Sequence, residues 1–187
     1  MGNAGDRRIE RWSTTSSAWI TPLGPPETEP SLVAPTGIFA TNDGVLLIAD
    51  AVRGRVCRVT TEGQWLSSIG KPGRSAGEFV RPKQVCCTPE GLIFVSDAGR
   101  QSVLVFDDAG RYVTEIHERA GKWQGWTLPM GLIAMSPADL LPLVQESGNG
   151  PNPAPDAYVI VSDSLGGTPL TLLGIVVQKK DTSEDGG

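Results

Sequence analysis

The sequence of 187 residues has few of the side chains on which most catalytic and metal sites depend. It contains one histidine, His117, and aromatic residues make up only 6% of the chain. A single histidine excludes a multi-histidine metal site. The P-loop, the dinucleotide-binding loop and the EF-hand motif are absent as well. We therefore expect no enzymatic activity, no cofactor and no metal site, and we expect His117 to be an exposed loop residue.

Cysteine is also scarce. Cys57, Cys86 and Cys87 are odd in number and show no C-x-x-C spacing, which favours free thiols in a reducing compartment over a disulfide framework. Because side chains alternate along a strand, one of the adjacent pair Cys86 and Cys87 should face the core and the other a neighbouring layer. We expect all three to be inert packing residues; the alternative for the adjacent pair is a redox or soft-metal feature.

Long hydrophobic runs are missing. No stretch approaches the roughly 20 apolar residues that a membrane-spanning helix needs, and the opening MGNAGDRRIERW has no apolar signal core. These absences, with the unpaired cysteines, predict an intracellular protein, cytoplasmic or organellar, that is neither secreted nor membrane-spanning.

Glycine and proline, in contrast, are abundant. The chain has 23 Gly and 15 Pro with 39% hydrophobic residues, a composition that suits many short strands joined by turns. Its net charge of −5 argues against electrostatic capture of nucleic acid by the whole molecule. The acidity is concentrated in residues 128–187.

A 47-residue repeat runs through most of the chain. Pro35, Pro82 and Pro129 are 47 residues apart. The same step relates further positions: Ile9, Val56 and Val103; Trp12, Val59 and Phe106; Leu32, Phe79 and Trp126; Gly44 and Gly91; Asp50 and Asp97; and Gly63 and Gly110. A period of this length indicates one supersecondary unit stacked several times.

Each unit contains four short apolar runs. In the first copy they lie at 37–40, 45–49, 56–59 and 65–69, and in the second at 84–87, 92–96, 103–106 and 112–116. Gly44 and Gly63 each follow small polar residues, the signature of a tight hairpin. The unit is thus predicted to be a four-stranded antiparallel meander, and its repetition predicts a β-propeller.

Residues at fixed places in the unit resemble NHL repeats, whose blades run roughly P-x-G-I/V, a turn glycine, an apolar strand ending in Asp, and then R-V/I-x-V-F. The matching residues are Pro35-Thr36-Gly37-Ile38, Gly44, Leu47-Ile48-Ala49-Asp50 and Arg55-Val56; Phe79-Val80-Arg81-Pro82, Gly91, Phe94-Val95-Ser96-Asp97 and Val103-Leu104-Val105-Phe106; and Trp126, Pro129-Met130-Gly131-Leu132 and Val159-Ile160-Val161-Ser162-Asp163. The resemblance covers about residues 32–173, with a half-blade at 7–12, and implies an all-β propeller of about six blades. Val52 departs from it, since the family usually has glycine there.

The repeat predicts about three and a half blades rather than a closed ring. We expect the outer two strands of a half-blade and a linker at 1–31, blades at 32–81, 82–128 and 129–178, and a flexible acidic tail at 179–187. The third blade carries an insertion at 136–155, with a short helix expected at 138–145, and ends in strands at 168–173 and 175–178. Three explanations of the incomplete ring stay open: a piece of a longer protein, an arc completed by a second copy or another subunit, or a divergent arc inside a larger complex.

The loops predict two faces of opposite charge. Connections between blades and between the second and third strands carry a net charge of +4, whereas the hairpin loops carry −4. Such a distribution would orient an anionic partner on the first face. The residues expected to bind such a partner are Arg53, Lys71, Arg74, Arg81, Arg100, Arg119, Lys122 and Trp123.

Acidic residues recur at the end of each second strand. Asp50, Asp97 and Asp163 could suggest calcium, but each occupies the same turn-capping position, and we expect a structural role.

We therefore predict a non-catalytic protein-interaction or scaffold module, an arc whose protein partner or second copy completes or covers the propeller. The alternatives are an RNA-binding propeller that uses the basic face, and a fragment of a metal-dependent propeller hydrolase or lyase. The role of the insertion at 136–155 is open.

Overall fold

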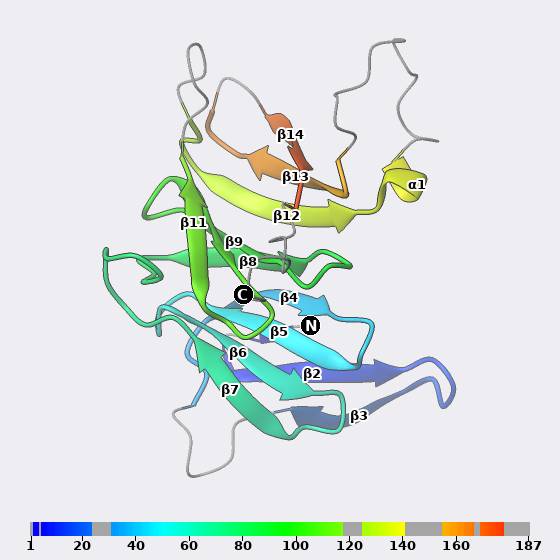
Figure 1. The fold of residues 1–187 in the computed structure, drawn as a ribbon. Helices are drawn as coiled ribbons and strands as arrows, with labels where there is room; N and C mark the ends of the chain where they lie inside the picture. Colours follow the sequence, from blue (N-terminus) through cyan, green and yellow to red (C-terminus); the bar gives the residue numbers. More distant parts are fainter. Residues whose placement is uncertain are drawn as a thin grey trace, which may run out of the picture.

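The computed structural model describes residues 2–3, 5–23, 31–117, 125–140, 155–166 and 169–177. Within them the chain forms four antiparallel sheets and one short helix. The sheets are stacked in chain order from the blue N-terminal sheet to the orange C-terminal one (Figure 1). This arrangement is an incomplete β-propeller, as the repeat predicted.

Successive strands along the chain are neighbours within each sheet. The first sheet contains β1 (Gly2–Asn3), β2 (Arg8–Ser13) and β3 (Ala18–Leu23). The second contains β4 (Pro35–Ala40), β5 (Val45–Asp50), β6 (Arg55–Thr60) and β7 (Trp65–Ile69). The third contains β8 (Pro82–Cys87), β9 (Ile93–Asp97), β10 (Ser102–Phe106) and β11 (Tyr112–Ile116). The fourth contains β12 (Pro129–Met135), β13 (Ala157–Asp163) and β14 (Leu170–Ile175).

The repeated prolines mark the start of the innermost strands. Pro35, Pro82 and Pro129 are the first residues of β4, β8 and β12, a place where the missing N–H removes no hydrogen bond from the sheet interior. The strands β4, β8 and β12 lie next to one another across the stack. They therefore line the inner edge of the arc.

Three apolar clusters hold the stack together, one between each pair of neighbouring sheets. The cluster between the second and third sheets includes Leu47, Phe79, Val95 and Phe106. The cluster between the third and fourth includes Phe94, Trp126, Val159 and Val161, and that between the first and second includes Ile9, Leu32 and Val59. All residues of β9 and β10 are buried, because the middle sheets are covered on both faces.

The ends of the arc differ in detail from the repeat prediction. The first sheet contains a third, two-residue strand, β1, which pairs with β2. In the fourth sheet, one strand, β14, stands where two were expected at 168–173 and 175–178. The expectation of a separate last strand was wrong, because β14 continues through Gly174 and pairs with β13 as far as Ile175.

Helix α1 (Pro137–Leu140) begins where the insertion was predicted to begin. The rest of the expected helix, most of the insertion and the acidic tail at 179–187 lie outside the described residues. No helix among the described residues is long and apolar enough to cross a membrane.

Candidate functional site

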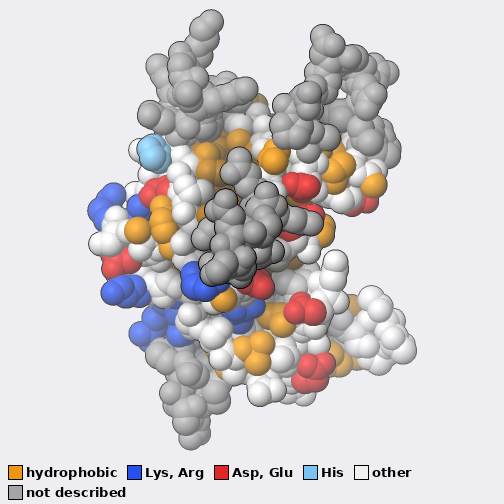
Figure 2. Space-filling view, viewed as in Figure 1, with side chains coloured by type: hydrophobic (Ala, Val, Ile, Leu, Met, Phe, Trp, Pro, Cys, Tyr) orange, Lys and Arg blue, Asp and Glu red, His pale blue; other side chains and the backbone are white. Residues whose placement is uncertain are grey.

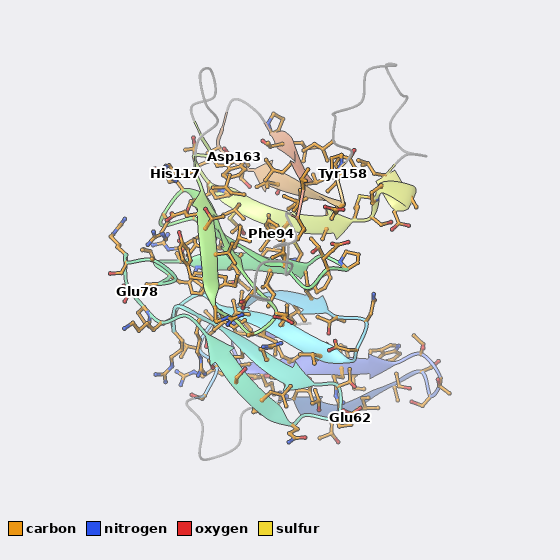
Figure 3. The ribbon with its side chains drawn as sticks, viewed as in Figure 1. Glu62, Glu78, Phe94, His117, Tyr158 and Asp163 are labelled. Atoms are coloured by element: carbon orange, nitrogen blue, oxygen red, sulfur yellow. The ribbon has the colours of Figure 1, made fainter. Side chains whose placement is uncertain are left out.

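The predicted basic face contains exposed arginines. Arg53, Arg74 and Arg81 are exposed on the connection loops. Figure 2 shows most of the visible Lys and Arg side chains over these loops, on the left of the view. Figure 3 places Glu78 on the same side and Glu62, from a hairpin loop, on the other. The two sets of loops therefore occupy opposite sides of the stack.

Two other basic residues of the predicted set, Lys71 and Arg100, form ion pairs with acidic residues. The Arg100 guanidinium forms a two-point contact with the Glu115 carboxylate, and its side chain is only 11% exposed. It also donates to the carbonyl of Ser75 at 3.3 Å. Lys71 lies 3.4 Å from a Glu78 carboxylate oxygen. Arg100 therefore links β11 to the connection between β7 and β8. Because these basic groups are paired, the described part of the predicted basic face carries less unpaired positive charge than the sequence suggests.

Three residues of the predicted set cannot be placed. Arg119, Lys122 and Trp123 lie outside the described residues. The nearby Trp126 is buried in the core, and its indole N–H donates to the Thr171 hydroxyl at 3.2 Å.

The recurring aspartates fasten the connections between sheets. Asp97 is fully buried and accepts backbone N–H groups of Val80, Arg81, Gly99 and Arg100 at 2.7–3.0 Å. Each of these aspartates thus binds both the turn that follows its strand and the segment entering the innermost strand of the same sheet.

The other two aspartates repeat this geometry. Asp50 accepts from Val33 and Ala34. Asp163 accepts from Thr127 and Leu128 at 2.8 Å. Burial acts to raise the pKa of Asp163, but these backbone donors outweigh it and hold the pKa below its ordinary value. These carboxylates have several protein donors each, and among the described residues no three His, Cys, Asp or Glu side chains form a group that could hold a metal ion.

One histidine and a serine in G-x-S-x-G spacing are the residues that bear on nucleophilic catalysis. His117 is exposed and follows β11, as Figure 3 shows. Residues 73–77 read Gly-Arg-Ser-Ala-Gly, the G-x-S-x-G spacing of a nucleophile elbow. That motif requires a turn from a strand into a helix, whereas this segment connects β7 to β8 and the Ser75 N–H donates to Glu78. The match is one of spacing alone.

The cysteines pack as side chains of the core. All three are free, and Cys57 and Cys86 are fully buried. Cys86 belongs to the cluster against the fourth sheet, while Cys87 packs against the cluster facing the second. Burial raises the pKa of both adjacent thiols. Deprotonation, and with it thiolate chemistry, is disfavoured at neutral pH.

Both ends of the stack carry exposed apolar side chains. Trp12 and Trp19 are cross-strand partners whose rings pack edge to face, with centroids 5.3 Å apart, and each is more than half exposed. The Arg11 side chain donates to the Thr61 carbonyl in the turn between β6 and β7. Because side chains alternate along a strand, the neighbouring Trp12 points to the opposite face, away from the second sheet. We call the surface around Trp12 and Trp19 the N-terminal end face.

The fourth sheet presents a second such surface. Ile133, Ile160 and Leu172 form one row across β12, β13 and β14, and Ile133, Leu170 and Leu172 are about half exposed or more. The residues that alternate with this row, such as Val159 and Val161, are buried against the third sheet. We call the surface formed by Ile133, Ile160, Leu170 and Leu172 the C-terminal end face.

A cavity of about 420 Å³ lies among the hairpin loops at the inner edge of the arc. Thr41, Thr88 and Ser136, which follow the innermost strands β4, β8 and β12, all line it. Sequence reasoning missed this hairpin cavity, although Thr41 and Thr88 occupy the same place in two copies of the repeat, and Ser136 lies one residue past that place in the third.

The comparisons with known proteins support the fold. No protein-family model and no curated protein sequence matches the chain. Among solved structures, it resembles Sqt1 of Saccharomyces cerevisiae (TM-score 0.55, 11% identity, 92% of this chain and 40% of that one). It also resembles a streptogramin B lyase (0.52, 13%, 93% and 50%) and the hydrazine synthase of Kuenenia stuttgartiensis (0.51, 18%, 80% and 35%). These are propeller-like proteins, and the chain spans half of their length or less. The likeness shows the β-propeller fold alone.

Proposed function

We propose that the chain is a non-catalytic interaction module, a propeller arc whose two end faces dock onto a second copy of itself. In this assembly the four sheets of one copy and the four of the other close one ring. Eight blades lie within the range of about four to eight that propellers use, although they exceed the roughly six that the resemblance to NHL repeats implies. The repeats are proposed to be of the NHL type, which their residues resemble, and the three free cysteines fit an intracellular setting.

The observation that carries the proposal is the pair of apolar end faces. In the middle of the stack, every sheet buries both faces against its neighbours. At the ends, Trp12 and Trp19 on one side and Leu170 and Leu172 on the other are left uncovered. Burying a large apolar side chain stabilises an assembly by about 1.5–3 kcal/mol. Packing of each end face against another sheet is therefore more favourable than its exposure to water.

A second copy covers both surfaces at once. A two-fold axis along the ring axis brings the N-terminal end face of each copy against the C-terminal end face of the other, so one contact is formed twice.

The mass of the purified chain in solution tests the proposal. Light scattering is expected to give twice the chain mass of 19.8 kDa. Leu172→Lys, which puts a charge on the C-terminal end face, is expected to give a folded monomer. Val113→Lys is the matched control, since Val113 is exposed to a similar extent on β11 of a middle sheet, and it should stay dimeric. A wild-type monomer at tens of micromolar would overturn the proposal.

Binding of single-stranded RNA is the second candidate function. The observation in its favour is the exposure of Arg53, Arg74 and Arg81 on one side of the stack. Fluorescence polarisation with a labelled oligouridine should show binding that weakens with salt and is lost when the three arginines are changed to Glu. Unchanged polarisation with the wild-type protein would reject this candidate.

A further inference from the structure

The hairpin cavity has the shape and lining of a small ligand site. Its volume of about 420 Å³ is within the range of about 300–1,000 Å³ typical of ligand pockets. Its apolar lining comes from strands of three sheets and includes Phe39, Val45, Leu47, Ile93 and Ala134. An elongated aliphatic group could pack against these side chains.

Carboxylates gather around this apolar lining. Asp43, Asp108 and Asp139 all line the cavity, and all three are exposed. The Thr41 hydroxyl donates to Asp43 and lowers its pKa, and the Ser136 hydroxyl donates to Asp139 at 2.6 Å. The described acidic residues do not form a group of three that could hold a metal ion. The three carboxylates are spread around the cavity instead of converging on one point, which favours an organic cation over a metal ion as the ligand.

Two polar groups of the cavity lack protein partners. The Thr88 hydroxyl is buried without a hydrogen bond, although the equivalent hydroxyl of Thr41 is bonded. Thr88 as a whole is only 3% exposed. The Nε atom of Arg58, the one basic residue of the cavity, is also buried without a partner. A buried polar group without a partner is destabilising, and both groups can donate to an acceptor oxygen.

We propose that the hairpin cavity binds a basic amino-acid unit, the side chain and carbonyl of a lysine or arginine. The aliphatic stem packs against the apolar lining, and the terminal cation lies among the carboxylates of Asp43, Asp108 and Asp139. The carbonyl oxygen accepts hydrogen bonds from Thr88 and Arg58. Three carboxylates against one guanidinium leave the empty cavity with an excess of negative charge, which the ligand cation offsets. The unit comes from a peptide or from the free amino acid.

Calorimetric titration of the wild-type protein tests this site with three probes: Nα-acetyl-L-lysine methylamide, the norleucine analogue that lacks the amine, and free L-lysine. The acetylated lysine amide is expected to bind at least tenfold more tightly than the norleucine analogue. Tighter binding of free L-lysine than of the amide would assign the site to the amino acid, and the reverse to a peptide. Equal affinity for the lysine and norleucine amides would overturn the proposal, as would Ca²⁺ binding that excludes the lysine amide.

Variants locate the binding in the cavity. The double change Asp43→Asn with Asp139→Asn should weaken binding of the lysine amide at least tenfold, and Thr88→Val should weaken it severalfold. Glu62→Gln is the matched control, because Glu62 lies on a hairpin loop of the same side but does not line the cavity. Circular dichroism checks that each variant is folded. Unchanged affinity in the folded double variant would overturn the site.

Discussion

At the scale of single residues, several charged groups of the described chain brace loops against sheets. Arg100 illustrates this. Its spacing placed it among partner-binding residues, yet its guanidinium is closed off by Glu115 and by the connection at residues 75–78. The hydrogen bond from Arg100 is the largest cause of the lowered pKa of Glu115. The same pair therefore couples folding to pH.

Replacing Arg100 by Gln should lower the free energy of unfolding at pH 7 by about 2 kcal/mol, because charge-assisted hydrogen bonds are lost. A lowered folded-state pKa means that Glu115 stabilises the protein above its unfolded pKa of about 4.3 and loses this effect as pH falls through the folded pKa. Urea unfolding between pH 3 and 7 should thus show a weaker pH dependence in R100Q. Arg111→Gln is the control, since its pair with Asp107 is exposed to solvent and should contribute much less to stability than the Arg100 pair. A pH profile of R100Q parallel to the wild type would contradict the assignment.

The cysteines make a second prediction at this scale. Because burial raises the pKa of Cys86 and Cys87, and Cys57 is buried as well, the native thiols should react with a thiol reagent at pH 7.5 far more slowly than in 6 M guanidinium chloride. The half-buried Cys87 should react first. Rapid labelling of the native protein at more than one site would show that the packing is looser than described.

At the scale of elements, the hairpin turns depend on glycines in the left-handed region. Gly44, between β4 and β5, has a φ of 82°, and an added Cβ would make an ordinary van der Waals contact at 3.8 Å with the Thr61 hydroxyl oxygen. Gly70, in the connection after β7, has a φ of 72°, and an added Cβ would overlap the ring of Phe79 and crowd the Gly77 carbonyl oxygen. Both positions therefore require a positive φ, but only at Gly70 does a neighbouring side chain leave no room for a Cβ.

Gly44→Ala should therefore cost about 1 kcal/mol of unfolding free energy, the strain of the left-handed backbone alone. Gly70→Ala should cost about 3 kcal/mol, because displacing Phe79 from the core adds to that strain. Chemical denaturation of both variants measures the difference. Equal losses would mean that the ring of Phe79 moves aside at no cost.

At the scale of the whole molecule, the stack of sheets ends in two uncovered apolar surfaces. If a second copy covers them, dissociation is coupled to unfolding and the melting temperature depends on protein concentration. We expect the Tm to rise by about 3 °C for each tenfold increase in concentration, and this dependence should vanish in Leu172→Lys. A Tm independent of concentration in the wild type would argue against self-association.

The sequence by itself determined the local architecture. The 47-residue register predicted the strands of the second and third sheets to within one or two residues, because turn glycines, alternating apolar side chains and strand-ending aspartates are local signals. It also predicted the propeller and its incompleteness. The strand predictions from the repeat were wrong at the two ends of the chain, where β1 is an additional strand and β14 stands in place of two predicted strands. The copies of the repeat at the ends are degenerate and lack the turn glycines and the regular apolar pattern.

Only the tertiary structure decided how these elements meet. Whether Arg100 was free or paired depended on how the turn that carries it packs against Glu115 on β11 and against the carbonyls of Ser75 and Glu78. The hairpin cavity required three sheets to bring Thr41, Thr88 and Ser136 together. The end faces likewise follow from which side of each sheet has a neighbour. Local sequence periodicity specifies a strand and its two faces, whereas burial, pairing and cavities arise from packing between distant segments.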